Sequence, residues 1–211
     1  MLAPALTQLR ALGGGKPSPT LTEYMKLVAF DGDNTLWEPL DRVNLSDRTP
    51  TDAEGWPHFT FTPADANPLL VVRGDGARFA LRPEVGEVLA TLKRHGVLRA
   101  VVSYNHESNV RSILEAFGVL SYFDYVVGEF HSNKDRMLRR VLAEARRDGH
   151  ELSAGDLLLV DDDPDSIYRG QCERMGAGFS CFGTDIHDLR EVLVLLDITS
   201  EQPPQSGGSN A

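Results

Sequence analysis

Two aspartates separated by one glycine, Asp31 and Asp33, are the first residues that could do chemistry. They follow the short apolar run of residues 27–30, which is typical of a buried strand. Two carboxylates held this close repel each other unless a cation is present, and Mg²⁺ prefers carboxylate oxygens as ligands. One carboxylate could then attack phosphorus while the other moves protons. Gly32 would let a phosphate approach the backbone and would offer its N–H. Taken alone, the segment could also be an Asp/Asn turn that ends a strand.

A second acidic group, Asp161-Asp162-Asp163, follows the apolar run of residues 157–160. Adjacent acids at the end of a buried strand repel one another, so a compensating cation is expected. Asp163 precedes Pro164 and has a structural explanation as a helix N-cap. Asp161 and Asp162 have no such explanation, and we assign them a role that involves a metal ion.

Two further polar groups carry weaker signals. Ser103, which Tyr104 and Asn105 follow, could bind phosphate oxygens through its hydroxyl and the neighbouring amides, although such residues are common in loops. Lys134 lies in the first turn of a predicted helix, where the partial positive charge disfavours a lysine unless an anion is bound. In isolation, Lys134 is best interpreted as solvated. Read in chain order, however, the four groups occupy successive strand ends. A separate structural explanation for each group does not account for this shared placement.

Strand and helix patterns alternate along the chain, which predicts an α/β fold. The sequence predicts a Rossmann-like parallel sheet with helices on both faces, and ligands in such sheets bind at the carboxyl ends of the strands. The further predicted strands are residues 99–103, 125–127, 156–160 and 178–182, and the apolar helical stripes are residues 85–92, 110–117, 138–145 and 189–196.

The segment of about residues 38–81 is too long for a simple loop between strand and helix. Residues 69–73 and 78–81 read as a hairpin around a glycine turn, and we expect a small flap over the end of the first strand and no large cap domain. A passive surface hairpin is the alternative. The candidates for contacting a substrate here and at the strand ends are Trp56, His58, Phe59 and Tyr104.

The bulk composition of the chain fits one domain. Its 211 residues predict a domain over residues 25–199, with a flexible extension over residues 1–24 and a disordered tail over residues 200–211. The net charge of −10 argues against a nucleic-acid partner. No apolar run approaches the roughly 20 residues of a membrane span, and no signal peptide is evident, so the default localisation is cytoplasmic. The two cysteines suggest reduced thiols in or near the core. None of these patterns bears on the oligomeric state.

The segment Phe30-Asp31-Gly32-Asp33-Asn34-Thr35-Leu36-Trp37, followed in order by the other three groups, resembles the haloacid dehalogenase (HAD) superfamily of phosphatases. More narrowly, its Thr-Leu-Trp ending, a short flap and a late Asp-Asp pair resemble the magnesium-dependent phosphatase group. The similarity extends over about residues 27–190. Tyr104 departs from this group, in which an arginine often follows the serine, and the departure puts a shared substrate in doubt.

The resemblance implies a phosphomonoester hydrolase that works through an aspartyl-phosphate. Asp31 would be the nucleophile and Asp33 the general acid and base. Asp31, the backbone carbonyl of Asp33 and Asp162 would hold Mg²⁺, with Asp161 in support. The substrate would be a phosphorylated small molecule or a phosphoprotein. The residues implied to hold the phosphoryl group are Gly32, Ser103, Tyr104 and Lys134.

Other functions remain open on the sequence. A phospho-accepting regulatory domain uses a similar set of residues, but it places the acid pair first and leaves Asp33 unexplained. A HAD relative that transfers a phosphoryl or acyl group is a second alternative, although acyl transfer would need an additional region with a reactive cysteine. A degenerate HAD fold that only binds a partner is a third, and the full set of catalytic residues argues against it.

Overall fold

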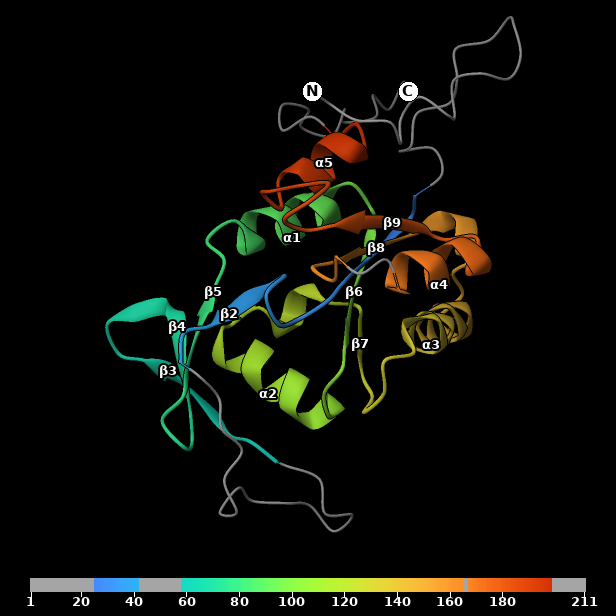
Figure 1. Cartoon of the computed structure of the whole chain (residues 1–211). Coiled ribbons are helices and arrows are strands. Elements are labelled where there is room, and N and C mark those ends of the chain that lie inside the picture. Colours follow the sequence, from blue (N-terminus) through green and yellow to red (C-terminus); the bar gives the residue numbers. More distant parts are fainter. Residues whose placement is uncertain (1–24, 42–57, 165–166, 199–211) are drawn as a thin grey trace, which may run out of the picture.

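The computed structural model describes residues 25–41, 58–164 and 167–198 (Figure 1). The extension predicted over residues 1–24 and the tail predicted over residues 200–211 lie outside the described residues, as does Trp56.

A five-stranded parallel sheet forms the centre of the fold. Its strand order is β7-β6-β1-β8-β9, so β1 is the middle strand, between β6 and β8. The five strand predictions are confirmed, with ends that shift by a residue. The bounds are β1 Leu27–Phe30, β6 Leu98–Ser103, β7 Tyr125–Gly128, β8 Leu157–Asp161 and β9 Gly178–Cys181.

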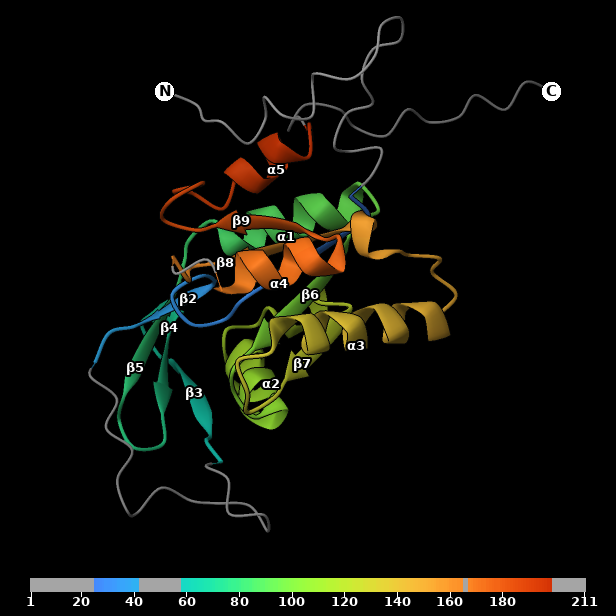
Figure 2. The same cartoon turned by 45° about the vertical axis from the view of Figure 1, so that its right-hand side comes forward.

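Helices cover both faces of this sheet, as the apolar stripes predict (Figure 2). The side chains of β1 alternate between two cores: Val28 and Phe30 pack with α1, α2 and α5, whereas Leu27 and Ala29 pack with α3 and α4. Burial on both faces explains why β1 is apolar at every position. The helices are α1 Val85–Arg94, α2 Glu107–Ala116, α3 Lys134–Arg147, α4 Ile167–Met175 and α5 Glu191–Leu195, with short 3₁₀ turns at η3 Leu120–Tyr122 and η4 Ala154–Asp156.

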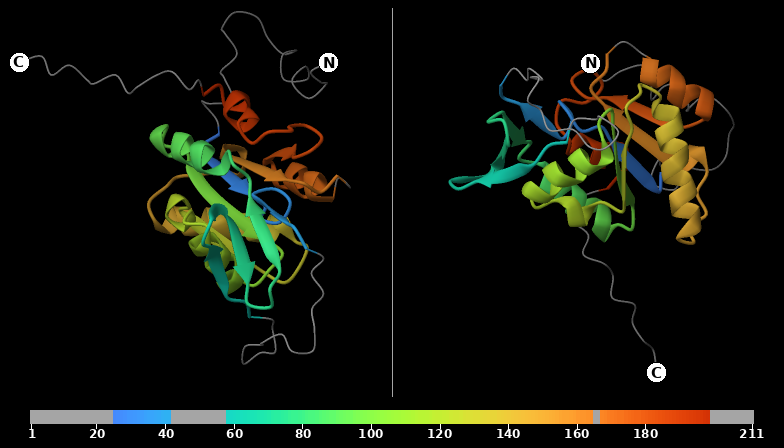
Figure 3. Two further views of the ribbon diagram at one scale, coloured as in Figure 1. Left: turned by 90° about the vertical axis from the view of Figure 1, so that its left-hand side faces the viewer. Right: turned by 90° about the horizontal axis from the view of Figure 1, so that it is seen from below.

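The insertion after β1 forms a second, antiparallel sheet with the order β2-β5-β4-β3. The predicted hairpin is confirmed as β4 paired with β5, and the sheet is wider than predicted because a strand joins each of its edges. This sheet lies beside α2 (Figure 3), and Val71, Phe79 and Leu81 anchor it in the core. Within the described residues, the insertion forms no separate cap domain. Its strands are β2 Trp37–Pro39, β3 Phe61–Ala64, β4 Asn67–Arg73 and β5 Arg78–Leu81.

Two sequence-based expectations concern the described residues as a whole. Both cysteines, Cys172 and Cys181, are buried free thiols, as predicted. No helix in the described ranges is both long and apolar enough to cross a membrane.

Candidate active site

Three of the predicted polar groups meet at the carboxyl end of the central strands. Asp31 directly follows β1, and its N–H donates to the Val160 carbonyl at 2.8 Å. Because β1 lies between β6 and β8, Asp31 is flanked by Ser103, the last residue of β6, and by Asp161, the last residue of β8. Ser103 and Asp161 are buried and Asp31 is nearly so, which fixes this edge of the sheet as an enclosed polar site.

Lys134 enters the same site from the first turn of α3. Its ammonium group donates to the Asp31 carboxylate and, at 2.8 Å, to the Val102 carbonyl, and it lies 3.0 Å from Asp161 Oδ2. Burial would lower the pKa of Lys134, but Asp31 and Asp161 outweigh this and raise it to about 12. The solvated interpretation of this lysine is therefore wrong: the side chain has no exposed surface, and its anions are two carboxylates of the chain itself.

Burial has the opposite consequence for Asp31. Loss of water raises the pKa of this carboxyl to about 7; Lys134 opposes the rise, and the nearby charges of Asp161 and Asp33 add to it. Asp161 is held on two sides, because Oδ1 accepts the N–H of Asp163 at 3.0 Å while Oδ2 faces Lys134. One ammonium group thus balances two buried carboxylates.

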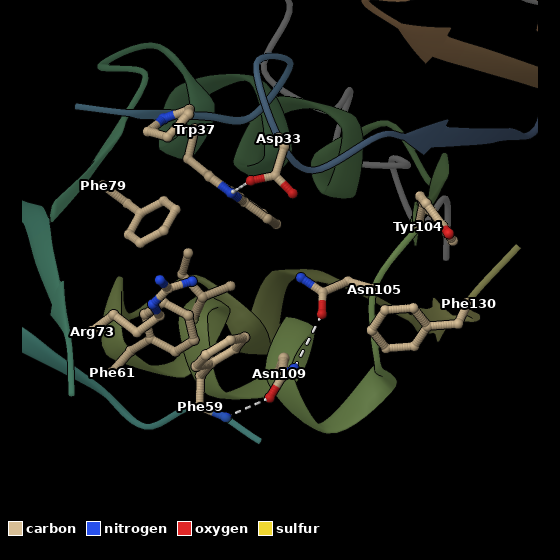
Figure 4. Close-up of a pocket in the computed structure, with 12 residues that line it drawn as sticks. Asp33, Trp37, Phe59, Phe61, Arg73, Phe79, Tyr104, Asn105, Asn109 and Phe130 are labelled. Atoms are coloured by element: carbon tan, nitrogen blue, oxygen red, sulfur yellow. Dashed lines mark hydrogen bonds between the residues drawn. The ribbon is translucent and has the colours of Figure 1, made fainter. Parts of the chain in front are cut away.

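The second aspartate of the first motif is held by a neighbour within the motif. Trp37 Nε1 donates a hydrogen bond of 2.9 Å to Asp33 Oδ1 (Figure 4). Burial raises the pKa of the Asp33 carboxyl, and the hydrogen bond from Trp37 lowers it by a smaller amount. The carboxyl group is consequently fixed in direction and favoured in its protonated form, the two properties that a general acid needs.

The loop that carries both aspartates is shaped by close contacts. An added Cβ on Gly32 would lie 2.5 Å from Cζ2 and Cη2 of the Trp37 ring, so only glycine fits beneath this indole. Asn34 adopts a positive φ of 61°, which asparagine tolerates better than most residues. Arg82, beyond the flap, donates to the Thr35 carbonyl at 2.9 Å and to the Asn34 carbonyl at 2.7 Å. The flap and the motif loop are therefore tied together.

A pocket of about 370 Å³ opens beside Asp33, between the flap and the start of α2. Figure 4 shows Phe59, Phe61, Phe79 and Arg73 on one side and Tyr104 with Phe130 on the other. Two of the predicted substrate-contacting residues, Phe59 and Tyr104, thus line this pocket, whereas His58 is exposed outside its lining. The pocket residues that the flap contributes, and Phe130, belong to no recognisable sequence motif.

The comparisons with known proteins agree with this architecture. Residues 74–173 match the model of the family described as haloacid dehalogenase-like hydrolase. That range contains Ser103, Lys134, Asp161 and Asp162, and it begins after Asp31 and Asp33. The predicted resemblance to the HAD hydrolases is confirmed. The expectation that the chain is a hydrolytic enzyme is confirmed by the same match.

Several solved structures share the fold at low sequence identity. A HAD-superfamily hydrolase of subfamily IA from Geobacter sulfurreducens has a TM-score of 0.53 at 18% identity, covering 81% of this chain and 99% of its own. A predicted phosphoglycolate phosphatase from Haemophilus somnus has a TM-score of 0.52 at 16% identity, with 82% and 98% covered. The N-terminal part of a Bacteroides fragilis protein, which contains a phosphatase domain complexed with Mg, has a TM-score of 0.51 at 18% identity, with 83% and 40% covered. None of the curated proteins matches the chain.

The oxygen donors of this site fit a magnesium ion. Asp162 is half-buried; burial and then the charge of Asp161 raise the pKa of its carboxyl, and a hydrogen bond from Asn34 opposes the rise. The pKa values of the Asp31 and Asp33 carboxyls are also raised. The site has more carboxylates than cations, and a divalent cation would offset this excess of negative charge. Among the described residues no three His, Cys, Asp or Glu side chains form a ready metal cage. Mg²⁺ does not need one, since it is commonly bound through one or two carboxylates together with waters and phosphate oxygens.

Four residues that hold parts of the site were missed by the sequence patterns. Trp37 was noted only as the end of a motif, although its position four residues after Asp33 is local enough to suggest the contact. Arg73 pairs with Asp75 two residues along the hairpin, and Arg82 donates to carbonyls of the loop after β1, but neither position stands out in the sequence. Gln171 of α4 is buried and holds the start of α3, because it accepts the Asp135 N–H and donates to the Ser132 carbonyl, both at 3.1 Å.

Proposed function

We propose that the chain is a magnesium-dependent phosphomonoesterase in which Asp31 is the nucleophile. The observation that carries the proposal is the placement of Asp31 at the end of the central strand, bonded to Lys134 and one residue away from the Asp33 carboxyl that Trp37 orients. An Asp31 oxygen would attack phosphorus, the ester oxygen would leave, and the chain would carry an aspartyl-phosphate. Water would then attack that phosphorus and release inorganic phosphate.

Asp33 would act in both steps. Its protonated carboxyl would give the proton to the leaving oxygen, and the resulting carboxylate would take a proton from the attacking water. The raised pKa caused by burial supports the first role, because the carboxyl holds its proton more readily than an exposed aspartate. The hydrogen bond from Trp37 supports both roles by keeping one orientation of the group.

The phosphoryl group would be held by Gly32, Ser103 and Lys134. The charge of Lys134 and the backbone N–H groups of the loop would stabilise the charge on the phosphoryl oxygens. Tyr104 would contribute through its backbone, because this residue lines the pocket beside Asp33 and is 57% exposed. Mg²⁺ would be held by Asp31, the Asp33 carbonyl and Asp162, with Asp161 in support, and would supply further charge neutralisation on the phosphoryl oxygens.

The test is hydrolysis of an aryl phosphate with and without Mg²⁺. Wild-type activity should disappear with a chelator and return with added Mg²⁺. Asp31→Asn should lower turnover at least about 10³-fold, since the nucleophile is lost. Acid quenching during turnover, followed by mass spectrometry of the peptides, should find one phosphoryl group on the peptide that contains Asp31. The matched control is Asp41→Asn, which removes a carboxylate paired with Arg78 at the flap edge and should leave turnover unchanged.

Two results would contradict the proposal. Retained turnover in Asp31→Asn would exclude a covalent role for this residue. Labelling of Asp31 without release of phosphate would instead indicate a phospho-accepting regulatory domain.

A further inference from the structure

We infer that the pocket beside Asp33 binds the leaving group of the substrate, and that this leaving group carries an aromatic ring. The inference rests on the proposed function, since it takes Asp33 as the acid that protonates the leaving oxygen. A general acid must lie within hydrogen-bond reach of that oxygen. Asp33 lines the pocket, whereas Asp31 and Lys134 are outside its lining, so the pocket lies on the leaving-group side of the site.

The walls of the pocket are mainly aromatic. On the flap side, Phe61 meets Phe79 edge to face at 5.6 Å and 73°, and it meets Phe59 at 6.5 Å and 69°. On the opposite side, Tyr104 meets Phe130 edge to face at 5.8 Å and 73°. Figure 4 shows these two groups facing each other across the opening. A planar ring entering between them would make the edge-to-face and offset contacts that aromatic pairs favour.

Two polar side chains in the lining, those of Arg73 and Asn109, are engaged within the wall. Arg73 donates to both carboxylate oxygens of Asp75, at 2.9 and 2.6 Å, and its guanidinium lies 4.1 Å above the centre of the Phe59 ring. Asn109 donates to the Asn105 side chain at 3.1 Å and accepts the Phe59 N–H at 2.8 Å. A sugar with many hydroxyl groups needs several polar partners, and the polar groups of Arg73 and Asn109 are already engaged in these contacts. An apolar ring needs none.

The presence of Arg73 in the pocket wall also favours an electron-rich ring. Arg73 is buried, and its guanidinium also lies 5.7 Å from the centre of the Phe79 ring, so its charge is fixed on the flap side of the pocket. A cation fixed beside the pocket attracts the negative face of an aromatic ring. The inferred ligand is therefore a phosphomonoester of an alcohol or phenol with an aromatic ring near the ester oxygen.

The test compares two esters whose leaving groups are both primary alkoxides. Benzyl phosphate and ethyl phosphate differ mainly in the ring, so the comparison isolates the pocket from the chemistry of the leaving oxygen. We expect kcat/KM for benzyl phosphate to exceed that for ethyl phosphate about 100-fold, the order expected for burying one ring. A ratio within about threefold of unity would overturn the inference while leaving the phosphatase proposal intact.

Phe59→Ala provides the matched perturbation. It removes one ring from the pocket and keeps the backbone N–H that Asn109 accepts. We expect the benzyl-to-ethyl ratio of kcat/KM to fall about tenfold. The control is Phe179→Ala on β9, which removes a ring stacked on Arg169 at 4.8 Å outside the pocket lining and should keep the wild-type ratio. A ratio that falls equally in both variants would overturn the inference.

A binding measurement separates the two proposals. Benzylphosphonate and ethylphosphonate cannot be hydrolysed, and calorimetry with Mg²⁺ should find the benzyl compound bound about 100-fold more tightly. This difference without hydrolysis of either ester would refute the phosphatase proposal, and with it the leaving-group role, but would retain the pocket as a site that binds an aromatic ring. Equal binding of the two phosphonates would refute the pocket assignment.

Discussion

Trp37→Phe is the substitution that most directly tests how Asp33 is positioned. It removes the indole N–H that donates to Asp33 Oδ1 at 2.9 Å while keeping an aromatic ring in the core and in the pocket wall. In the second step, where Asp33 would be the carboxylate that activates water, a hydrogen bond to this charged group contributes about 1.5–3 kcal/mol. If that energy orients Asp33 for proton transfer, its loss should lower kcat about 10- to 150-fold, at 1.36 kcal/mol per tenfold change in rate.

The same substitution should affect stability and KM much less. Phenylalanine leaves a small cavity in place of part of the indole, which should lower the free energy of unfolding by about 1–2 kcal/mol. The ring that remains should keep substrate binding close to wild type. The assay is steady-state hydrolysis of a phosphomonoester with Mg²⁺, combined with urea unfolding of the same preparations.

Phe117→Leu is the matched control. Phe117 packs against Trp37 with ring centres 6.4 Å apart, so the control disturbs the same region of the core without touching Asp33. It should lower stability by a similar amount, about 1–2 kcal/mol, and leave kcat within about twofold of wild type. Equal kcat values for the two variants would refute a positioning role for Trp37.

Two further predictions concern the scaffold. Gly128→Ala should lower the free energy of unfolding by about 1–3 kcal/mol in urea titrations, because the new Cβ would lie 2.6 Å from the Asn105 carbonyl oxygen and the Glu107 nitrogen. Gly86→Ala should raise the free energy of unfolding instead, because Gly86 lies in a helix and has open space for a Cβ. Burial raises the pKa of the Cys172 thiol to about 12 and also raises that of Cys181, so both should stay protonated at pH 8. Neither should react with a thiol reagent until the chain is unfolded, and rapid reaction of either thiol in the native protein would contradict this.

The proposed catalytic side of the site could be located from the sequence because its signals are local. Residues 27–30 are apolar at every position since both faces of β1 are buried, and Asp31 follows where that run stops. Parallel strands bring their carboxyl ends to one edge, so the order of the polar groups along the chain already implies that they meet. The assignments of Ser103 and Asp161 to this edge follow from the same rule.

Lys134 shows where local reasoning gave a wrong result. Its position in the first turn of α3, taken in isolation, indicated a solvated side chain. The ammonium group is instead buried against Asp31 and Asp161, which lie far from it in the sequence and come close to it only through the order of strands in the sheet. The electrostatics of the helix end alone therefore cannot identify the partner of a side chain there, because residues at the ends of neighbouring strands can lie beside it.

The leaving-group side of the site is harder to predict for a related reason. The pocket brings together the flap, the loop after β6 and Phe130, three segments whose contacts depend on how an antiparallel sheet packs against α2. Its residue types are those of an ordinary core, so aromatic spacing alone does not separate a binding wall from packing. The distinguishing feature is Asp33, which belongs to the catalytic motif and also lines the pocket. Chains that share the Asp31–Asp33 motif but differ in Phe59, Arg73 or Phe130 should therefore keep the phosphoryl chemistry and differ in the alcohol they release.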